Sequence, residues 1–204
     1  MHDRAQDGWD ALYADGKVQQ LPWYYEALDP DVEAALGRRA LASGHALDLG
    51  CGPGTQSLHL VRHGFEVTAS DISGAAVLHT ERLASEQGLT LHGVVDDILH
   101  SQLTGPFDLV VDRGCFHVLP PGRRSHYVDT MARILAPAGV LLLKCFSEKQ
   151  PGTTGPYRLS PTELREAFAS HLDTASVERT VYQGTTRPPP HALFAEFQRG
   201  VRRP

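Results

Sequence analysis

The sequence lacks several features that would narrow its class at once. Its 204 residues include only three cysteines, widely spaced and without a Cys-x-x-Cys pair, which argues against a disulfide scaffold or a zinc site. His59 and His63 have helical spacing but no evident third ligand, so we expect no metal. No apolar run approaches the ~20 residues that span a bilayer. The net charge is −5, so we expect neither a nucleic-acid nor a membrane partner.

The start of the chain also lacks an apolar signal core. Met1-His2-Asp3-Arg4 is polar, which predicts a cytoplasmic protein. A chain of this length suits one domain with a full core, so we expect a single domain over residues 1–204. The sequence does not indicate an oligomeric state.

Short apolar segments alternate with helix-compatible segments from residue 45 onward. We predict strands at about 45–49, 65–70, 90–95, 107–111, 139–146, 174–182 and 191–198, and helices at about 30–42, 55–63, 73–87, 121–136 and 160–170. Leu141-Leu142-Leu143 is a continuous apolar run, typical of a parallel strand buried on both faces. The alternation predicts an α/β fold with a doubly wound, mostly parallel sheet and a ligand at the carboxyl ends of its strands.

Two helix starts have clear capping signals. Asp29 precedes Pro30, as expected of a cap followed by a proline at the first helical position. Ser160 is followed by Pro161 and by Glu163 at the third helical position, which is the pattern of a capping box.

The strand at 45–49 runs into a glycine-rich turn, Asp48-Leu49-Gly50-Cys51-Gly52-Pro53-Gly54. Glycine accepts positive φ and lets a ligand approach the backbone closely. The helix that follows aims its first N–H groups at the same place. The next strand ends at Asp71, where a carboxylate can accept hydrogen bonds from ribose hydroxyls. The two features together predict a cofactor that contains a nucleoside.

The glycine spacing separates two cofactor classes. A dinucleotide fingerprint needs Gly or Ala at the sixth position, but the sixth residue counted from Gly50 is Thr55. The pattern Asp-x-Gly-x-Gly-x-Gly, led by Asp48, instead resembles motif I of the class I S-adenosylmethionine-dependent methyltransferases. In that family the acid after the third strand lies beside the adenine, and Asp97-Ile98 matches this position. A nicotinamide-dependent oxidoreductase and a non-catalytic cofactor-binding protein remain the alternatives from other classes.

A second resemblance lies downstream of motif I. Its elements are Asp112-Arg113-Gly114, Pro121-Gly122-Arg123, Tyr127-Val128-Asp129-Thr130-Met131 and Gly155-Pro156-Tyr157. This series is similar to thiopurine S-methyltransferases and related thiol, halide and tellurite methyltransferases, over about Trp9 to Phe168. Motif I departs from the degenerate form found in thiopurine enzymes, which leaves the identity of the acceptor open.

The resemblance implies fold, chemistry and a covering segment. The implied fold is the Rossmann-like methyltransferase fold with an antiparallel C-terminal strand. The implied reaction is methyl transfer from S-adenosylmethionine to a small-molecule acceptor, with a thiol sulfur preferred and an oxygen or nitrogen of a small natural product as the alternative. Related proteins carry an aromatic N-terminal segment over the cofactor, so we expect residues 1–44 to form a cap.

These motifs supply the expected cofactor-binding residues. They are Trp9, Tyr13, Trp23, Asp48, Gly50, Cys51, Gly52, Gly54, Asp71, Ile72, Asp97, Ile98 and Asp112. The tryptophans and Tyr13 are able to attract the positive sulfonium, or alternatively to pack an N-terminal helix.

Two residues after the fourth strand are expected to serve catalysis. The Arg113 fork can hold an anionic group of the substrate or the cofactor carboxylate, and an ion pair with Asp112 or Asp108 is the alternative. His117 has a plausible position for a general base, with a structural histidine as the alternative.

Overall fold

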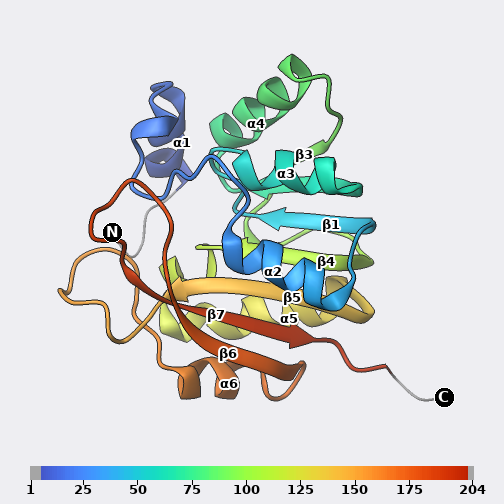
Figure 1. Cartoon of the computed structure of the whole chain (residues 1–204), viewed down its shortest axis with the longest axis vertical. Coiled ribbons are helices and arrows are strands. Elements are labelled where there is room, and N and C mark those ends of the chain that lie inside the picture. Colours follow the sequence, from blue (N-terminus) through green and yellow to red (C-terminus); the bar gives the residue numbers. More distant parts are fainter. Residues whose placement is uncertain (1–5, 202–204) are drawn as a thin grey trace.

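Seven strands form one sheet in the order β3-β2-β1-β4-β5-β7-β6 in the computed structural model, which describes residues 6–201 (Figure 1). The strands are β1 (Gly44–Leu49), β2 (Phe65–Asp71), β3 (His92–Val95), β4 (Phe107–Arg113), β5 (Leu135–Phe146), β6 (Asp173–Val181) and β7 (His191–Gln198). Neighbours from β3 to β5 pair in parallel, whereas β7 is antiparallel to both β5 and β6. The predicted fold class, a mostly parallel sheet with an antiparallel C-terminal strand, is confirmed.

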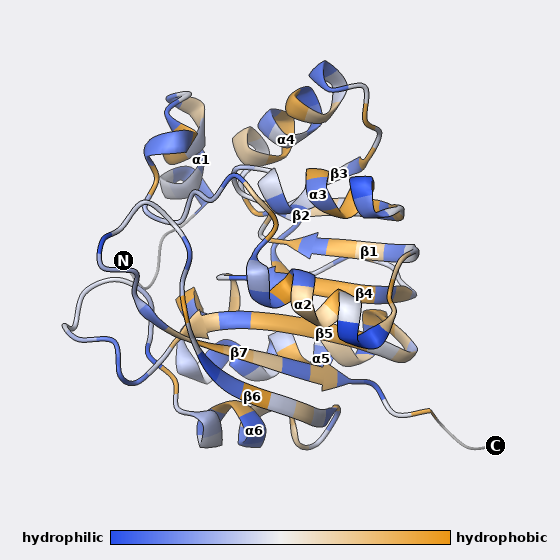
Figure 2. Cartoon of the chain, in the orientation of Figure 1, coloured by the Kyte–Doolittle hydropathy of each residue, from blue (hydrophilic) through white to orange (hydrophobic). Residues whose placement is uncertain are grey.

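Helices cover both faces of this sheet. They are α1 (Gln6–Ala14), α2 (Pro30–Arg39), α3 (Thr55–His63), α4 (Gly74–Glu86), α5 (Arg124–Ile134) and α6 (Pro161–Phe168), with 3-10 turns at Val18–Gln20, Ile98–His100, Phe116–Val118 and Pro121–Arg123. One core cluster joins α2 and α3 to the sheet, and a second joins α5 and α6 to the opposite face. Figure 2 shows the apolar residues concentrated along the central strands. No helix within residues 6–201 has the length and apolar character to cross a membrane.

The two clusters follow the alternation of side chains along each strand. In β1, Ala46 packs with the α2 and α3 cluster, and the next residue, Leu47, packs with the α5 and α6 cluster. In β5, Leu141 and Leu142 divide in the same way. An apolar run without polar interruptions is therefore what a strand covered on both faces requires.

The local capping signals are present as the sequence predicts. Asp29 caps α2, because its Oδ1 accepts a hydrogen bond from the Asp31 backbone N–H at 3.1 Å. Ser160 and Glu163 form the reciprocal capping box of α6. Proline occupies the start of both helices.

Three element boundaries differ from the expected ones by three or more residues, and the others differ by two at most. α2 ends at Arg39, because Ala40 adopts a left-handed φ of 52° and its N–H bonds back to Gly37 and Leu36. The helix expected from residue 121 begins with a 3-10 turn and becomes α-helical only at Arg124. β5 starts four residues early, at Leu135, because an irregular register lets Leu135 pair with Phe107. None of these differences moves the predicted site.

Candidate active site

The glycine turn and Asp71 lie together at the carboxyl edge of the sheet. Gly50, Gly52 and Gly54 have φ values of +70°, +47° and +77°. The Gly52 N–H donates to Asp71 Oδ2 at 3.0 Å, and the Ser73 N–H donates to Asp71 Oδ1 at 2.9 Å. Burial raises the pKa of Asp71 to about 6, against the opposing effect of these two N–H donors. The turn is therefore held in place by the same carboxylate that the sequence assigns to the ribose.

Gly52 is required for a steric reason as well as a conformational one. A Cβ at this position would lie 2.6 Å from the Tyr13 hydroxyl oxygen, closer than a real Cβ contact allows. Tyr13 is buried, and its hydroxyl accepts a hydrogen bond from Trp23 Nε1 at 3.2 Å. Trp9 packs edge-on against Trp23, with 6.0 Å between ring centroids. The three predicted N-terminal aromatic residues thus form one cluster next to the glycine turn.

Asp10 connects this N-terminal segment to the start of α4 by hydrogen bonds. Its Oδ1 accepts hydrogen bonds from Ser73 Oγ at 2.6 Å and from the Ala75 N–H at 3.1 Å. These bonds lower the pKa of Asp10 below its ordinary value. Asp10 is a contact that the sequence analysis missed, since no local pattern connects it to a helix more than 60 residues away.

The other predicted cofactor residues fall into two groups. Asp48 is buried, and its Oδ2 accepts from Ser57 Oγ at 2.5 Å, so it fixes α3 to the end of β1. Burial raises the pKa of Asp48 to about 6. Cys51 is also buried, and it contacts Thr80 through Sγ at 3.6 Å. Asp48 and Cys51 therefore connect the glycine turn to α3 and α4, through Ser57 and Thr80.

The second group follows β2 and β3. Asp97 caps the turn after β3 by accepting from the Leu99 N–H at 3.0 Å, and its Oδ2 lies 2.8 Å from His100 Nδ1. Ile98 is buried and Ile72 is half-buried. The neighbouring Asp96 keeps a buried Oδ2 that has no hydrogen-bond partner among the described residues. An unfilled acceptor at this edge suits the exocyclic amino group of a purine.

Asp112 is buried and all its acceptor capacity is occupied. It accepts from the backbone N–H groups of Gly114, Cys115 and Phe116 at 2.9, 2.6 and 2.9 Å, and from the Tyr127 hydroxyl at 2.7 Å. Burial raises its pKa above the ordinary value. Asp112 therefore shapes the loop after β4, and the structure does not place it as a direct cofactor ligand.

Arg113 also has structural partners where the sequence predicts a substrate contact. Its Nε donates to Asp29 Oδ2 at 2.8 Å, its Nη1 donates to the Trp23 carbonyl at 2.9 Å, and its Nη2 donates to the Gln183 carbonyl. The ion pair therefore forms with Asp29, not with Asp112 or Asp108. All three guanidinium nitrogens of Arg113 donate to the protein itself, so this geometry does not support the expected binding of an anionic substrate group.

Comparison with known proteins supports a cofactor site at the glycine turn and Asp71. A model of the methyltransferase domain matches residues 46–139, which include the glycine turn, Asp71 and Asp97. A 2-heptyl-1-hydroxyquinolin-4(1H)-one methyltransferase of Mycobacteroides abscessus is 27% identical, over 90% of this chain and 85% of its own. A thiopurine S-methyltransferase of Legionella pneumophila is 28% identical, over 94% of this chain and 92% of its own.

A solved structure extends the likeness to the whole fold. It comes from work on the conversion of a disulfide bond into a thioacetal group during echinomycin biosynthesis, and it matches with a TM-score of 0.84. The two chains are 25% identical, over 97% of this chain and 94% of the other. The chain is a class I S-adenosylmethionine-dependent methyltransferase.

The predicted base of this methyltransferase, His117, is held in a tautomer that does not suit a base. Its Nδ1 accepts the Phe146 backbone N–H at 2.8 Å, so in the neutral ring the proton is on Nε2. Burial, followed by the charges of Arg124, Arg158 and Arg113, lowers the pKa of His117 to about 3. The ring is thus a neutral hydrogen-bond donor whose only basic lone pair is occupied.

Sequence reasoning missed two residues of the methyltransferase that lie beside Arg113 and His117, in the region that we call the acceptor edge. Tyr182 stacks on His117 with 5.8 Å between ring centroids, and its hydroxyl donates to the Arg113 carbonyl. Lys144 is buried, and its Nζ pairs with Asp29 and with Asp31 Oδ2 at 2.7 Å. A charged residue ending the run Leu141-Leu142-Leu143 was the one available signal for Lys144. Nothing in the sequence links Tyr182 to His117.

Proposed function

We propose that this methyltransferase acts on a small molecule whose acceptor atom is already ionised in solution, with a thiol sulfur attached to an aromatic ring as the preferred acceptor. The state of His117 carries the proposal. With the Nδ1 lone pair engaged by the Phe146 N–H, this histidine is unable to remove a proton from the acceptor. A thiol with a pKa near ~8.5 is partly ionised near neutrality without help, and an aryl thiol more so.

The similar proteins support a ring-attached, acidic acceptor group. One relative is named for a thiopurine and another for a 1-hydroxyquinolin-4(1H)-one, and the solved structure comes from work on disulfide chemistry. Thiopurines and hydroxyquinolones are planar nitrogen heterocycles that carry an acidic S–H or O–H. The second candidate acceptor is therefore an acidic hydroxyl on a heteroaromatic ring, which the first relative favours.

The described residues fit S-adenosylmethionine as the methyl donor. The glycine turn presents backbone without side chains at this edge of the sheet, and the Tyr13 hydroxyl lies against Gly52. We assign the ribose hydroxyls to Asp71, and the adenine to Asp97 and Ile98 with the free Asp96 oxygen beside them. When bound, the cofactor supplies an electrophilic methyl group on a sulfonium. The chain's own contribution is to align the acceptor with that methyl group and to exclude water.

The N-terminal segment is proposed as the part that excludes water. We keep the assignment of residues 1–44 as a cap, of which 1–5 lie outside the described residues, with the aromatic cluster of Trp9, Tyr13 and Trp23 as the portion above the cofactor. The remainder of this range includes α2, which packs on the sheet with its buried Val32 and Leu36. We also keep the cytoplasmic location as a prediction.

An acceptor screen tests the proposed function. The purified protein is incubated with S-adenosylmethionine and with aryl thiols, alkyl thiols, halides, phenols or 1-hydroxyquinolin-4(1H)-one, and S-adenosylhomocysteine is quantified. We expect aryl thiols to give the highest kcat/KM. Turnover confined to unactivated phenols or amines contradicts the proposal. Cofactor binding without turnover of any acceptor indicates a non-catalytic binding protein.

A further inference from the structure

Three arginines bring positive charge to His117, and they differ in how their donors are used. The charges of Arg113, Arg124 and Arg158 all act on this histidine. Arg113 donates from all three nitrogens, as described above. Arg158 donates to three carbonyls of its own loop, those of Gln150, Pro156 and Pro151. Both groups are therefore committed to holding backbone segments.

Arg124 is different. Its Nε and Nη2 are buried, and neither has a hydrogen-bond partner among the described residues. A buried donor that lacks a partner destabilises the folded protein, and a charged one does so more strongly. Desolvation lowers the pKa of Arg124, although a guanidinium stays charged at physiological pH. Arg124 is thus a cation whose hydrogen-bonding capacity the fold leaves unused.

Two aromatic rings fix the plane of this guanidinium. The Arg124 Cζ lies 5.3 Å from the centroid of Phe116 and 5.2 Å from the centroid of Tyr157. Phe116 belongs to the loop after β4, and Tyr157 belongs to the loop after β5. The Tyr157 N–H donates to the His117 carbonyl at 2.8 Å, which joins these two loops. The walls that hold Arg124 are therefore the loops that border the predicted acceptor site.

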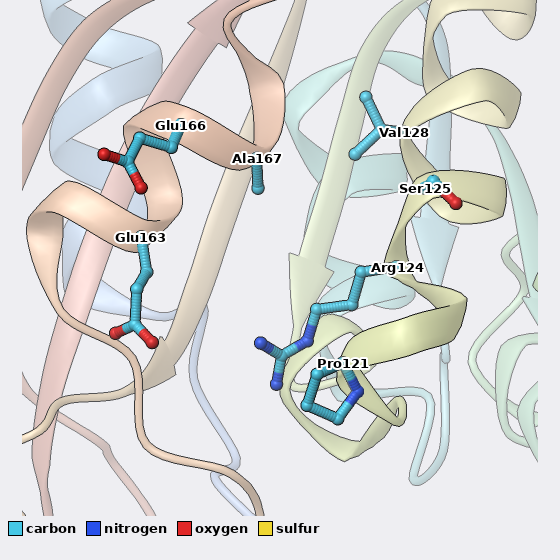
Figure 3. A pocket seen from close by; sticks show the side chains of 7 residues that line it. All are labelled: Pro121, Arg124, Ser125, Val128, Glu163, Glu166 and Ala167. Atoms are coloured by element: carbon cyan, nitrogen blue, oxygen red, sulfur yellow. The ribbon is translucent and has the colours of Figure 1, made fainter.

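A pocket of about 410 Å³ opens beside Arg124, between α5 and α6. Figure 3 shows Arg124 reaching from α5 toward this space, with Glu163 and Glu166 on the α6 side. Val128 and Ala167 give the pocket an apolar surface. α5 and α6 both begin after the carboxyl ends of their preceding strands, so this pocket lies on the same edge of the sheet as the glycine turn.

We propose that Arg124 is a specificity-determining residue, which binds the negative charge of the ionised acceptor or of an oxygen attached to its ring. The proposal rests on the proposed function, because an acceptor that arrives ionised needs a positive partner and Arg113 is neutralised by Asp29. A planar guanidinium offers two parallel N–H groups, which suit a thiolate beside a ring nitrogen or an oxyanion beside a carbonyl. The two nitrogens that lack partners are buried in the free protein, so an acceptor reaches them only when the neighbouring side chains move apart, while the two aromatic rings hold the plane of the guanidinium.

Glu163 sets the strength of this interaction. Its Oε2 accepts the Ser160 N–H at 2.7 Å in the capping box, and its negative charge acts on Arg124. A carboxylate on the opposite wall of the pocket weakens the attraction for an anion. Substitution by glutamine keeps an acceptor oxygen for the capping box and removes that charge.

The first test compares two acceptors of similar size, 4-nitrothiophenol, which is ionised at pH 7.5, and 2-phenylethanethiol, which is mostly protonated. We expect Arg124→Gln to raise KM for 4-nitrothiophenol about tenfold, equal to ~1.4 kcal/mol. KM for 2-phenylethanethiol and the Kd of S-adenosylmethionine are expected to change less than twofold. Arg123→Gln, at the exposed neighbouring position, is the matched control and should leave both acceptors unchanged. Equal losses for the two thiols, or a weaker cofactor Kd, overturn the proposal.

A binding titration separates this proposal from the proposed function. 4-Nitrothiophenolate is titrated into protein saturated with S-adenosylhomocysteine, followed by its absorbance, so no turnover is needed. We expect Arg124→Gln to weaken binding about tenfold and Glu163→Gln to strengthen it severalfold. A structural role for both residues predicts losses in both variants, and that result overturns the assignment. Failure of the acceptor screen with a normal Arg124 effect here would overturn only the proposed reaction.

Discussion

Lys144 Nζ lies 2.7 and 2.8 Å from the two carboxylate oxygens of Asp29, and both side chains are buried. The same carboxylate accepts from Arg113, and the same ammonium pairs with Asp31. Two cations and two anions thus meet between α2 and the ends of β4 and β5. Attraction among buried charges offsets their desolvation only while all partners remain.

Lys144→Met is expected to destabilise the protein by about 3–5 kcal/mol, because it leaves the two carboxylates of Asp29 and Asp31 with Arg113 as the one remaining cation of the group. Urea unfolding at pH 7.5 measures the effect. Lys149→Met, at an exposed position just after β5, is the matched control and should change the free energy of unfolding by less than about 0.5 kcal/mol. Similar losses in the two variants would contradict a special role for the buried ion pair.

Cofactor affinity is expected to depend on pH through Asp71, whose pKa in the free protein is about 6. In the proposed site the ionised carboxylate is the acceptor for the ribose hydroxyls, so we expect the Kd of S-adenosylmethionine to be about tenfold weaker at pH 5 than at pH 7.5. Calorimetric titration measures this dependence. Asp71→Asn should bind weakly and with a much flatter pH profile. An unchanged slope in that variant would assign the titration to another group.

The stability of the cofactor-free protein should follow the opposite trend. The folded pKa values of Asp48 and Asp71, both about 6, lie above the ~3.9 of an unfolded aspartate. The folded state therefore binds more protons between these values, and the free energy of unfolding contributed by these two groups falls as the pH rises from about 4 to about 6. Above pH 6 their contribution is level. Denaturation curves of wild type and Asp48→Asn at several pH values test this sign.

Arg113→Lys is expected to act on stability and on all acceptors alike. An ammonium cannot keep the bonds to the Trp23 and Gln183 carbonyls together with the Asp29 pair, so a loss of about 2–3 kcal/mol is expected. KM values for 4-nitrothiophenol and 2-phenylethanethiol should rise by the same factor. A selective rise for the ionised thiol would restore Arg113 as a direct substrate ligand.

His117→Asn is expected to reduce kcat/KM by the same factor for strongly and weakly acidic acceptors. With a pKa of about 3, His117 is neutral throughout the working range, so kcat/KM should follow the ionisation of the acceptor and show no inflection from this residue. Steady-state kinetics from pH 5 to 9 with two thiols of different acidity provide the measurement. A loss confined to the weaker acid would indicate general base catalysis.

Patterns within a few residues predicted the cofactor half of the molecule well. The glycine turn, the Asp29 cap and the Ser160–Glu163 capping box each depend on backbone geometry, which nearby residues determine. Contacts between distant segments could not be predicted in this way. Arg113 meets Asp29 from 84 positions away, and Tyr182 meets His117 only because β7 attaches β6 to the sheet. In this region the sequence predicts that Arg113 and His117 contact the substrate, whereas in the structure both side chains hydrogen-bond to other parts of the protein.

The Arg113 side chain has a consequence for how this chain is made. Its guanidinium joins the carbonyl of Trp23 to that of Gln183, a residue that follows 160 positions later in the chain. During synthesis the first of these partners leaves the ribosome long before the second. Because β6 is attached to the sheet through β7, the region around Arg113 is completed only after β7 has emerged, later than the glycine turn and Asp71.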